Sequence, residues 1–460
     1  MSETHFDVIV LGAGPGGYLA AERLGHAGKM VALVEEQYLG GTCLNVGCIP
    51  TKTLLNGAKN YLHAKEAGQF GVDAQGVSVN WAQMQAWKDQ VVKGLVAGVA
   101  ATERKAGVTV INGRGRLDAP GRVTVEGTAY TSDHVIIATG SVPAMPPLPG
   151  TQDNPALVDS TGILSLPEVP ARLAVIGGGV IGVEFASVWR SYGVDVTIIE
   201  GLPNLVPNED PSVSKQLERS FRKRGIKFST KTMFDRAEQN ESSVTVYTQD
   251  GKSFTADYLL VAIGRGPATS GLGYEEQGIS MDRGFVLTDE RLRTNVPGVY
   301  AVGDIVPGLQ LAHRGFLQGI FVAEEIAGLN PRVIDENFIP RVTFSNPEIA
   351  SVGLNQNKAE EKYGKENVEA VEFNLAGNGK SQMLGTQGFV KLVRVKDGPI
   401  VGFHAIGARM GEQVGEGQLL VSWEAQPEDF DGLIHAHPTQ NESIGEALLA
   451  LAGKPLHTHN

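Results

Sequence analysis

The sequence predicts an α/β protein in which one doubly wound unit occurs twice and a C-terminal α+β domain follows. Two observations predict the repeated unit: a glycine-rich motif occurs twice, and in both copies an acidic residue follows its first glycine by the same interval. A third observation concerns residues 339–460, where alternating apolar runs and helical segments indicate an antiparallel sheet with helices. The length of 460 residues agrees with about three domains.

The composition argues against several classes of protein. Lys and Arg total 39 against 51 Asp and Glu, a net charge of −12, which argues against nucleic acid as a partner. No apolar run approaches the ~20 residues of a membrane-spanning helix. Residues 1–6 leave no room for a signal or transit peptide before the first expected strand, so a cytoplasmic location is expected.

The first copy of the motif begins with the apolar run of residues 6–11, which leads into Gly12-x-Gly14-x-x-Gly17 and then a helix. A second strand ends at Glu35, 23 residues after Gly12. This is the Rossmann fingerprint, in which the glycines allow the tight turn, the approach of a pyrophosphate and the close packing of helix on strand. Glu35 is expected to bond a ribose hydroxyl, so the unit predicts a bound dinucleotide.

The second copy follows an apolar run at residues 173–176. Gly177, Gly179 and Gly182 occupy the three glycine positions, and Glu200 lies 23 residues after Gly177. Two copies predict two dinucleotides held at once, which points to electron transfer between them. Because an acid at this position favours a ribose 2′-hydroxyl and no arginine follows Glu200 at once to receive a 2′-phosphate, NAD is favoured over NADP.

Smaller elements are expected between and after the two copies. A strand that leads to a glycine closes each unit, at residues 135–140 and 259–264, and the proline-rich residues 142–150 resemble a linker. Residues 294–304 predict a turn, a strand and a Gly–Asp pair that could close on a polar ligand. Further helices are expected at residues 88–105, 313–328 and 444–451.

The two cysteines of the chain, Cys43 and Cys48, stand five positions apart within residues 39–52, LGGTCLNVGCIPTK. Five positions span about 7.5 Å along an ideal helix at ~1.5 Å per residue. Bridging them therefore needs a distorted turn and would give a readily reduced disulfide. Paired cysteines in a cytosolic protein tend to be catalytic, although two buried free thiols are an alternative reading.

His437 is the histidine best placed for dithiol chemistry. A base with a near-neutral pKa, oriented by a carboxylate, can remove a thiol proton and hold the thiolate as an ion pair, and Glu442 follows five positions later. The alternative is a capping box, in which Thr439 is the N-cap and Glu442 reaches back to its N–H. From the residues alone, both interpretations of Glu442 stay open.

Together these motifs resemble the FAD-dependent pyridine nucleotide–disulfide oxidoreductases, and among them the branch of the dihydrolipoamide dehydrogenases. Five segments carry the resemblance over essentially the whole chain: GGTCLNVGCIPTK, GGGVIGVEFAS, TNVPGVYAVGDI, LAHRG and HAHPTQNE. The resemblance implies oxidation of protein-bound dihydrolipoyl groups with reduction of NAD⁺ to NADH, through a redox-active Cys43–Cys48 disulfide and FAD. It also implies a homodimer that serves lipoyl-bearing proteins of 2-oxoacid dehydrogenase complexes or of the glycine cleavage system.

The resemblance divides the chain into four segments. An FAD-binding domain would begin in residues 1–145 and continue, as a central part, in residues 271–338. An NAD-binding domain would occupy residues 146–270, and an interface or dimerisation domain residues 339–460.

The same resemblance assigns roles to single positions. Cys43 would be the interchange thiol that meets lipoamide, Cys48 the charge-transfer thiol beside the flavin, and His437 with Glu442 the acid/base pair acting on the cysteines of the other subunit. Lys52 and Glu184 would pair beside the flavin. The FAD site would comprise Gly12, Gly14, Gly17, Glu35, Lys52, Gly115, Thr139, Asp304 and Ala312. The NAD site would comprise Gly177, Gly179, Gly182, Glu200, Gly264 and Arg265, and no metal site is expected.

Some segments depart from the family pattern. Residues 266–268, Gly-Pro-Ala, stand where the family often has Pro-Asn, and Thr51 stands where serine is common. Residues 376–387 (AGNGKSQMLGTQ) and 409–426 match least well. An unusual preference for a substrate or partner would be expected to arise in these last two segments.

Three rival functions remain. Glutathione and mercuric reductases share the cysteine pair but usually use NADPH, against which Glu200 argues, and a mercuric reductase carries a further C-terminal cysteine pair that this sequence lacks. A remote alternative from another class is a non-catalytic scaffold or sensor that binds FAD and NAD. Such a protein could lose Cys43, Cys48 or His437 freely, and all three are present.

Overall fold

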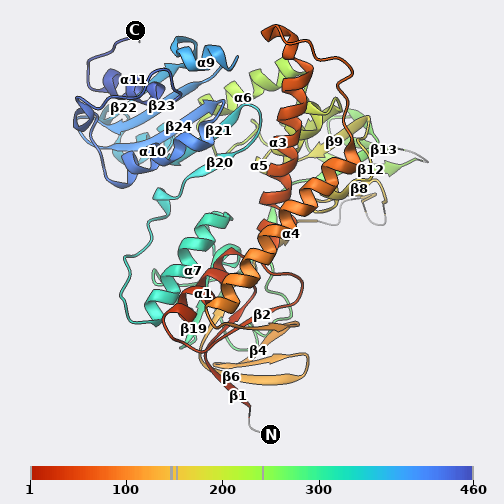
Figure 1. Ribbon diagram of the computed structural model, residues 1–460, viewed down its shortest axis with the longest axis vertical. Coiled ribbons are helices and arrows are strands. Elements are labelled where there is room, and N and C mark those ends of the chain that lie inside the picture. The colour runs from red at the N-terminus through yellow and green to blue at the C-terminus, as the bar shows by residue number, and fades with distance from the viewer. Residues whose placement is uncertain (1–2, 146–148, 152–153, 241–242, 458–460) are drawn as a thin grey trace.

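The computed structural model describes residues 3–145, 149–151, 154–240 and 243–457. Three larger sheets, of seven, five and five strands, organise these residues, and three smaller sheets accompany them (Figure 1). The sheet formed mainly by the N-terminal part lies at one end of the molecule and the C-terminal sheet at the other. Two long helices, α3 (Cys48–Lys65) and α4 (Trp81–Lys105), run from the N-terminal sheet to the side of the middle sheet. The observed mixture of parallel sheets, helices and a final antiparallel sheet confirms the predicted fold class.

The N-terminal sheet has seven strands in the order β3-β2-β1-β6-β5-β4, with β19 added beside β6. Its strands are β1 (Thr4–Leu11), β2 (Val31–Glu35), β3 (Thr109–Asn112), β4 (Gly115–Ala119), β5 (Arg122–Val125), β6 (Thr128–Ile137) and β19 (Val299–Ala301). β1 pairs in parallel with β2 and β6, and it is buried on both faces from Val8 to Leu11. A continuous apolar run is what a parallel strand covered on both faces requires.

The middle sheet repeats this parallel arrangement with five strands in the order β11-β10-β9-β15-β8. Its strands are β8 (Leu157–Val158), β9 (Arg172–Ile176), β10 (Asp195–Ile199), β11 (Lys227–Ser229) and β15 (Tyr258–Val261). An antiparallel three-stranded sheet accompanies it, formed by β12 (Phe234–Gln239), β13 (Val244–Thr248) and β14 (Ser253–Ala256). In both parallel sheets the second strand stops at the predicted acid or just before it.

The expected linker at residues 142–150 is only partly a linker. β7 (Ser141–Pro143) pairs antiparallel with β16 (Arg265–Pro267), so the chain leaving the first unit lies beside the chain returning to it. A second short ribbon joins β17 (Met281–Asp282) to β18 (Phe285–Val286). Residues 146–148 of the expected linker lie outside the described residues.

The C-terminal sheet is antiparallel, in the order β20-β21-β24-β23-β22, as expected. Its strands are β20 (Arg341–Thr343), β21 (Glu348–Gly353), β22 (Val368–Asn374), β23 (Phe389–Val395) and β24 (Ile400–Gly407). Within the alternating pattern that begins after residue 339, residues 341–353 form two strands, β20 and β21, with a loop between them. The helices of this region are α8 (Gln356–Tyr363), α9 (Gly379–Met383), α10 (Met410–Ser422) and α11 (Glu442–Leu451).

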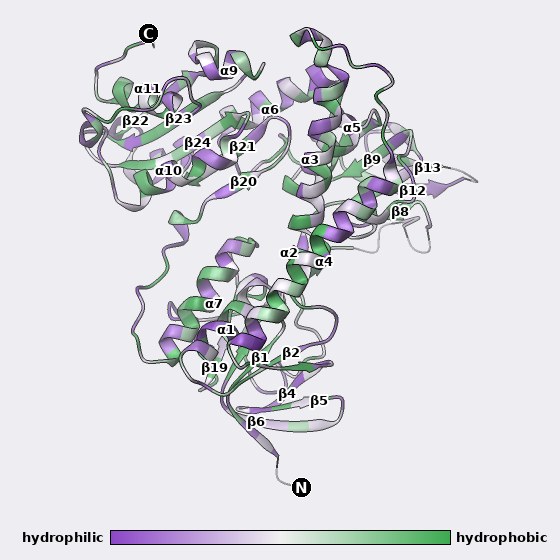
Figure 2. Ribbon diagram, in the orientation of Figure 1, coloured by the Kyte–Doolittle hydropathy of each residue, from purple (hydrophilic) through white to green (hydrophobic). Residues whose placement is uncertain are grey.

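The remaining helices connect and cover the two parallel sheets (Figure 1). They are α1 (Pro15–His26), α2 (Gly41–Asn45), α3 (Cys48–Lys65), α4 (Trp81–Lys105), α5 (Val180–Ser191), α6 (Pro211–Arg224) and α7 (Ala312–Ile326). Short 3₁₀ segments occur at residues 67–70, 162–165, 303–305, 336–338, 365–367, 375–377 and 427–430. Figure 2 shows α3 and α4 with polar and apolar residues interspersed along their length, as expected of helices with one packed face.

One predicted helix is longer than expected. The helix placed at residues 88–105 begins at Trp81, because Asn80 caps it by accepting a hydrogen bond from the Gln83 N–H at 3.1 Å. The Trp81 indole then donates to the Leu166 carbonyl at 2.8 Å, which fastens the start of α4 to the middle unit. In the described residues, no helix combines the length and apolar character that crossing a membrane would require.

Polar contacts dock the C-terminal sheet on the middle unit. The Lys391 ammonium lies 3.0 Å from an oxygen of Asp210, and the Ser351 hydroxyl donates to Glu209 at 2.6 Å. Arg224 at the end of α6 donates to the Asn346 carbonyl at 2.7 Å. The contacts of Lys391 and Ser351 are buried and pair charged or hydrogen-bonding groups, so they help to set the orientation of the C-terminal sheet.

Candidate active site

The first glycine loop has the geometry that its fingerprint predicts. Gly12 has φ +99°, and a Cβ there would lie 2.4 Å from the Ala138 carbonyl oxygen. A Cβ on Gly17 would lie 1.8 Å from the Gly12 carbonyl oxygen, so only glycine permits helix α1 to approach the strand this closely. Gly14, by contrast, has no atom nearer than 4.0 Å to an added Cβ.

The second loop reproduces these distances. Gly177 has φ +104°, and its added Cβ would lie 2.3 Å from the Ala262 carbonyl oxygen. On Gly182 the added Cβ would lie 1.9 Å from the Gly177 carbonyl oxygen, whereas Gly179 has nothing within 4 Å. The two outer glycines therefore serve the fold, and the middle glycine of each loop leaves open space at a helix N-terminus.

The acids at the ends of the second strands fold back on these loops. Glu35 Oε2 accepts the Ala13 N–H at 2.7 Å, and Glu200 Oε2 accepts the Gly178 N–H at 2.5 Å. Each acid is therefore held beside its loop, at the edge where a ribose would lie. Open backbone at a helix N-terminus next to a fixed carboxylate fits the pyrophosphate and ribose of a dinucleotide.

The other positions predicted for FAD lie around the first unit. Asp304 Oδ2 accepts a hydrogen bond from the Ser141 hydroxyl at 2.6 Å, and Ala312 is the first residue of α7. Thr139 accepts a long hydrogen bond, 3.5 Å, from the Tyr274 hydroxyl. Packing explains Gly115, because a Cβ there would lie 2.7 Å from the Leu11 side chain.

The structure places Arg265 between the two units. Its Nε donates to the Ser141 hydroxyl at 2.7 Å, and its Nη2 donates to the Ser141 carbonyl at 2.6 Å. The same serine hydroxyl reaches Asp304, so Arg265 is joined to a residue predicted for FAD although it was predicted for NAD. Gly264 precedes it with φ +126°, a conformation that favours glycine.

The two cysteines do not share a helix. Cys43 lies in α2, which ends at Asn45, and Cys48 is the first residue of α3. Gly47 allows the break between the helices, since a Cβ there would lie 2.9 Å from the Thr42 carbonyl oxygen. Both cysteines are free thiols in this structure and are partly buried.

The two thiols differ in acidity. A hydrogen bond from Cys43, assisted by the Lys52 ammonium and opposed by burial, lowers the pKa of the Cys48 thiol to about 7. The same hydrogen bond, together with burial, raises the pKa of Cys43 above its ordinary value. At neutral pH the pair therefore favours a thiolate at Cys48, where the N-terminus of α3 also favours negative charge, and a protonated thiol at Cys43.

Two residues hold Lys52: Glu184, which the family resemblance implied as its partner, and Phe344, which no motif indicated. The Lys52 ammonium lies 2.7 Å from Glu184 Oε2, as expected. The other oxygen of Glu184 accepts the Phe344 N–H at 2.8 Å, and the Lys52 ammonium lies 5.0 Å from the centre of the Phe344 ring. Burial disfavours the ammonium ion, but Glu184 and the two thiols outweigh burial, so the pKa of Lys52 is raised.

Phe344 lies on the turn between β20 and β21, so this contact ties the cysteine helix to the C-terminal sheet. No sequence motif marks Phe344, because its backbone N–H and its ring both act through tertiary contacts about 160 residues from Glu184.

Glu442 both orients His437 and caps the chain. Its Oε1 lies 2.8 Å from His437 Nδ1, and its Oε2 accepts the Thr439 N–H at 2.7 Å. Glu442 therefore makes the contact expected of each interpretation, one through each carboxylate oxygen, although the rest of the capping box is not formed. The predicted N-cap was wrong: Asn441 is the N-cap of α11, and the Thr439 hydroxyl donates to the Ala436 carbonyl at 2.6 Å.

His437 presents its other nitrogen outward. Its side chain is 77% exposed, and no hydrogen bond to Nε2 occurs among the described residues. No contact joins His437 to Cys43 or Cys48 within the described part of this chain. A second histidine pair supports the loop, since His435 Nε2 lies 2.8 Å from Glu416, which also accepts a hydrogen bond from the Asn441 amide at 2.7 Å.

Two glycine loops, a thiol pair at a helix N-terminus and a carboxylate-bound histidine define a flavin-type disulfide oxidoreductase. The family described as pyridine nucleotide-disulphide oxidoreductase matches residues 6–319, and the dimerisation domain of the same family matches residues 339–448. The chain belongs to this family.

Within this family, the chain is similar over its full length to dihydrolipoyl dehydrogenases. The chain is 40% identical to a dihydrolipoyl dehydrogenase of Bacillus subtilis (strain 168) over 99% of both chains. It is also 40% identical to that of Geobacillus stearothermophilus, over 98% of this chain and 97% of the other. The solved structure of LpdA from Mycobacterium tuberculosis has a TM-score of 0.90 at 27% identity, and covers 97% of this chain and 99% of its own.

A further solved structure is a disulfide reductase of another name. The HOCl-induced flavoprotein disulfide reductase RclA from Escherichia coli matches with a TM-score of 0.87 at 27% identity, over 96% of this chain and 99% of its own. The whole fold is therefore shared beyond the dihydrolipoyl dehydrogenases.

Proposed function

We propose that this protein is a dihydrolipoamide dehydrogenase, which oxidises protein-bound dihydrolipoyl groups to lipoyl groups and reduces NAD⁺ to NADH. The observation that carries the proposal is the arrangement of the two cysteines: Cys43 lies in α2, Cys48 begins α3, and the Lys52–Glu184 ion pair lies on the helices beside them. Full-length identity of 40% to dihydrolipoyl dehydrogenases supports the choice of substrate. FAD and NAD are the cofactors, and FAD supplies a path for two electrons from the thiols to NAD⁺.

The cofactor residues follow from the open loops. Gly12, Gly14, Gly17 and Glu35 would hold FAD, and Gly177, Gly179, Gly182 and Glu200 would hold NAD. Lys52, Gly115, Thr139, Asp304 and Ala312 would complete the FAD site, and Gly264 and Arg265 the edge of the NAD site. The contact of Arg265 with the serine that reaches Asp304 suggests that Arg265 also supports the FAD side.

The chain's own residues then act on the dithiol in sequence. His437 Nε2 takes the proton of one dihydrolipoyl thiol, and Glu442 at Nδ1 stabilises the imidazolium ion that forms. The resulting thiolate attacks the Cys43 sulfur of the oxidised pair, forming a mixed disulfide and releasing Cys48 as the thiolate. The second dihydrolipoyl sulfur then attacks the lipoyl sulfur of the mixed disulfide and its proton passes to the departing Cys43 sulfur. The products are the lipoyl disulfide, a Cys43 thiol, a Cys48 thiolate and the His437 imidazolium ion.

We place the complete site between two subunits of a homodimer. His437 is exposed and has no contact with the cysteines of its own chain among the described residues, and residues 339–448 match the family's dimerisation domain. The domain divisions 1–145, 146–270, 271–338 and 339–460 remain our assignment. Lipoyl-bearing proteins of 2-oxoacid dehydrogenase complexes or of the glycine cleavage system would be the partners, in the cytoplasm.

An absorbance assay tests the proposal. The purified flavoprotein, mixed with dihydrolipoamide and NAD⁺, should form NADH at 340 nm. NADP⁺ in place of NAD⁺ should support much slower turnover, because Glu200 disfavours a 2′-phosphate. Faster reduction of glutathione disulfide with NADPH than oxidation of dihydrolipoamide with NAD⁺ would assign the protein to the glutathione-reductase type instead.

A further inference from the structure

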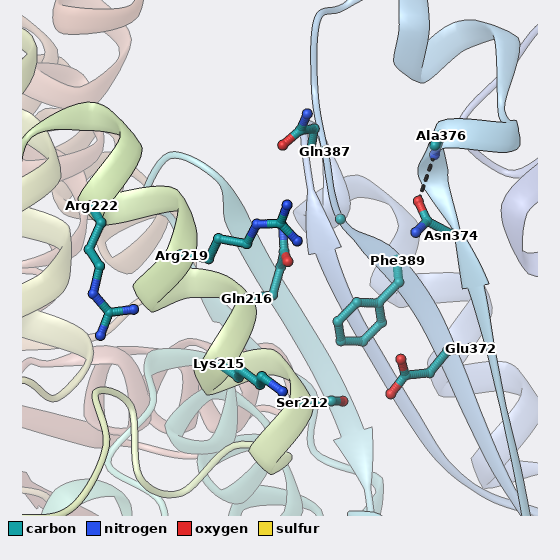
Figure 3. A pocket seen from close by; sticks show the side chains of 11 residues that line it. Ser212, Lys215, Gln216, Arg219, Arg222, Glu372, Asn374, Ala376, Gln387 and Phe389 are labelled. Carbon is teal, nitrogen blue, oxygen red and sulfur yellow. Dashed lines mark hydrogen bonds between the residues drawn. The ribbon is translucent and has the colours of Figure 1, made fainter.

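A cleft of about 620 Å³ lies between α6 and the edge of the C-terminal sheet formed by β22 and β23 (Figure 3). None of the residues assigned to the cysteines, FAD or NAD lines it. Its rim includes Ala376 and Gln387, the first and last residues of the segment 376–387 that departs from the family pattern. The proposed redox function therefore leaves both the cleft and this segment unexplained.

One wall of the cleft is positively charged. Lys215 and Arg219, one helical turn apart on α6, extend towards the strands in Figure 3. In the parts of the chain that the structure describes, neither side chain forms an ion pair. Arg222 is engaged elsewhere, with its guanidinium 4.5 Å above the Phe228 ring. Two free cations facing one cleft are notable in a chain with a net charge of −12.

The opposite wall combines an aromatic ring with hydrogen-bonding groups. Phe389 contributes its ring, and Gln387 an amide near the position that Arg219 approaches (Figure 3). Glu372 supplies the only carboxylate among the lining residues, and it lies 3.6 Å from Lys391, which is closer to Asp210. The cleft therefore presents cations on one side. On the other side it presents hydrogen-bonding groups and the small exposed part of Phe389, which is otherwise buried.

We propose that this cleft binds a phosphorylated small molecule that carries hydroxyl groups, of about the size of a nucleotide. Lys215 and Arg219 would bind its phosphate through charge-assisted hydrogen bonds. Glu372 would accept hydrogen bonds from its sugar hydroxyls, the role for which a carboxylate is suited. Phe389 would contact its apolar face, and the volume lies within the ~300–1,000 Å³ of small-molecule sites.

Binding can be measured without turnover, so this proposal stands apart from the redox function. The FAD-loaded protein, saturated with NAD⁺ to fill the second glycine loop, is titrated calorimetrically with AMP, ribose 5-phosphate and inorganic phosphate. AMP should bind most tightly and phosphate least. The double variant Lys215→Gln/Arg219→Gln should weaken AMP binding about tenfold or more, as expected for the loss of two charge-assisted hydrogen bonds.

A matched control removes two charges with the same spacing. Lys358→Gln/Lys362→Gln changes two exposed lysines four positions apart on α8, neither of which lines the cleft, and should leave AMP affinity unchanged. Equal losses in both double variants would show a general charge effect and overturn the proposal. The absence of measurable AMP binding at millimolar concentration would also overturn it.

Glu372→Gln tests the hydroxyl contact, because it should affect the binding of phosphate and the relative binding of ribose 5-phosphate in opposite directions. Removal of the carboxylate should strengthen phosphate binding, because a repulsive charge is lost, and weaken ribose 5-phosphate binding relative to phosphate. If all three probes instead bind more tightly and by the same factor, the cleft recognises charge alone and the proposed ligand class is wrong. Displacement of AMP by an acidic peptide of higher affinity would assign the cleft to a polypeptide and likewise overturn the proposal.

Discussion

The two glycine-loop units have nearly the same backbone but different surroundings. The helices α1 and α5 each span 12 residues and start from loops whose glycine distances agree within about 0.1 Å at the outer positions. At equivalent places along the two helices the first unit has Leu19 and the second has Glu184, which binds Lys52. The loop backbone of both units therefore leaves open space beside a fixed carboxylate, and in the second unit one helix side chain, Glu184, connects the unit to the cysteine helix.

The two helices also differ in what covers them. α1 is crossed by α7, where a Cβ on Gly319 would lie 2.2 Å from the Gly16 carbonyl oxygen, so the helices touch through glycine. α5 instead faces α3 and the C-terminal sheet, which explains why buried polar residues such as Glu184 and Ser187 lie along it. The first unit thus packs its motif helix, α1, against its own helix α7. The second unit packs its motif helix, α5, against both the cysteine helix α3 and the C-terminal sheet.

The largest expected effect concerns the cysteines, which follow the second strand of the first unit and have no counterpart in the second unit. Cys43→Ser should reduce oxidation of dihydrolipoamide by at least ~10³-fold, since Cys48 alone cannot form the disulfide that the substrate reduces. Reduction of an artificial dye by NADH should persist, because it needs only the two nucleotide sites. Full dihydrolipoamide turnover in the variant would show that Cys43 is not the interchange thiol.

The next effect concerns a residue that belongs to neither unit. His437→Gln should lower turnover with dihydrolipoamide by ~10²–10⁴-fold, the usual contribution of a general base, with little change in melting temperature because the side chain is exposed. Glu442→Gln should have a smaller effect on turnover but lower the melting temperature, since it weakens the contact with the Thr439 N–H as well. If both variants lose stability but keep their activity, the His437–Glu442 pair has only a capping role and no role in catalysis.

The middle glycines compare the two units directly. Gly179→Ala has room in the fold, so the protein should keep its melting temperature while KM for NAD⁺ rises about tenfold, as expected if the methyl group meets the bound nucleotide. Gly14→Ala should instead lower FAD retention during purification. The control Gly182→Ala places its Cβ 1.9 Å from a carbonyl oxygen and should fail to fold normally. Loss of FAD in Gly179→Ala would reverse the assignment of the loops.

The smallest expected effect tests the contact between Glu184 of the second unit and Lys52 of the cysteine helix. Lys52→Met should raise the pKa of the Cys48 thiol above about 7, because the ammonium that stabilises the thiolate is gone. The rate of alkylation of the reduced protein should then rise with pH through a higher midpoint. Phe344→Leu, which keeps the N–H bond to Glu184, should shift that midpoint in the same direction by less than about one unit, the scale of a cation–π contact. An unchanged midpoint in Lys52→Met would exclude this coupling.

Much of the fold was readable because its signals are local. The glycine spacings, the acid 23 residues later and the alternating runs after residue 339 predicted both parallel units and the antiparallel sheet. Local signals failed to predict the bounds of elements that depend on a helix cap or on pairing with a distant strand. Asn80 lengthened α4 beyond the expected range, and the return strand β16 turned part of the expected linker into a paired ribbon.

The site divides in the same way. Residue types and short spacings identified the cysteines, the glycines, Glu35, Glu200 and the histidine, because turn geometry and thiol chemistry demand these residues at these intervals. Only the folded chain revealed the acidity difference between the thiols, the two simultaneous contacts of Glu442, the position of Arg265 between the units and the contact of Phe344 with Lys52. Those properties depend on burial and on contacts between residues far apart in the chain, which no local pattern encodes.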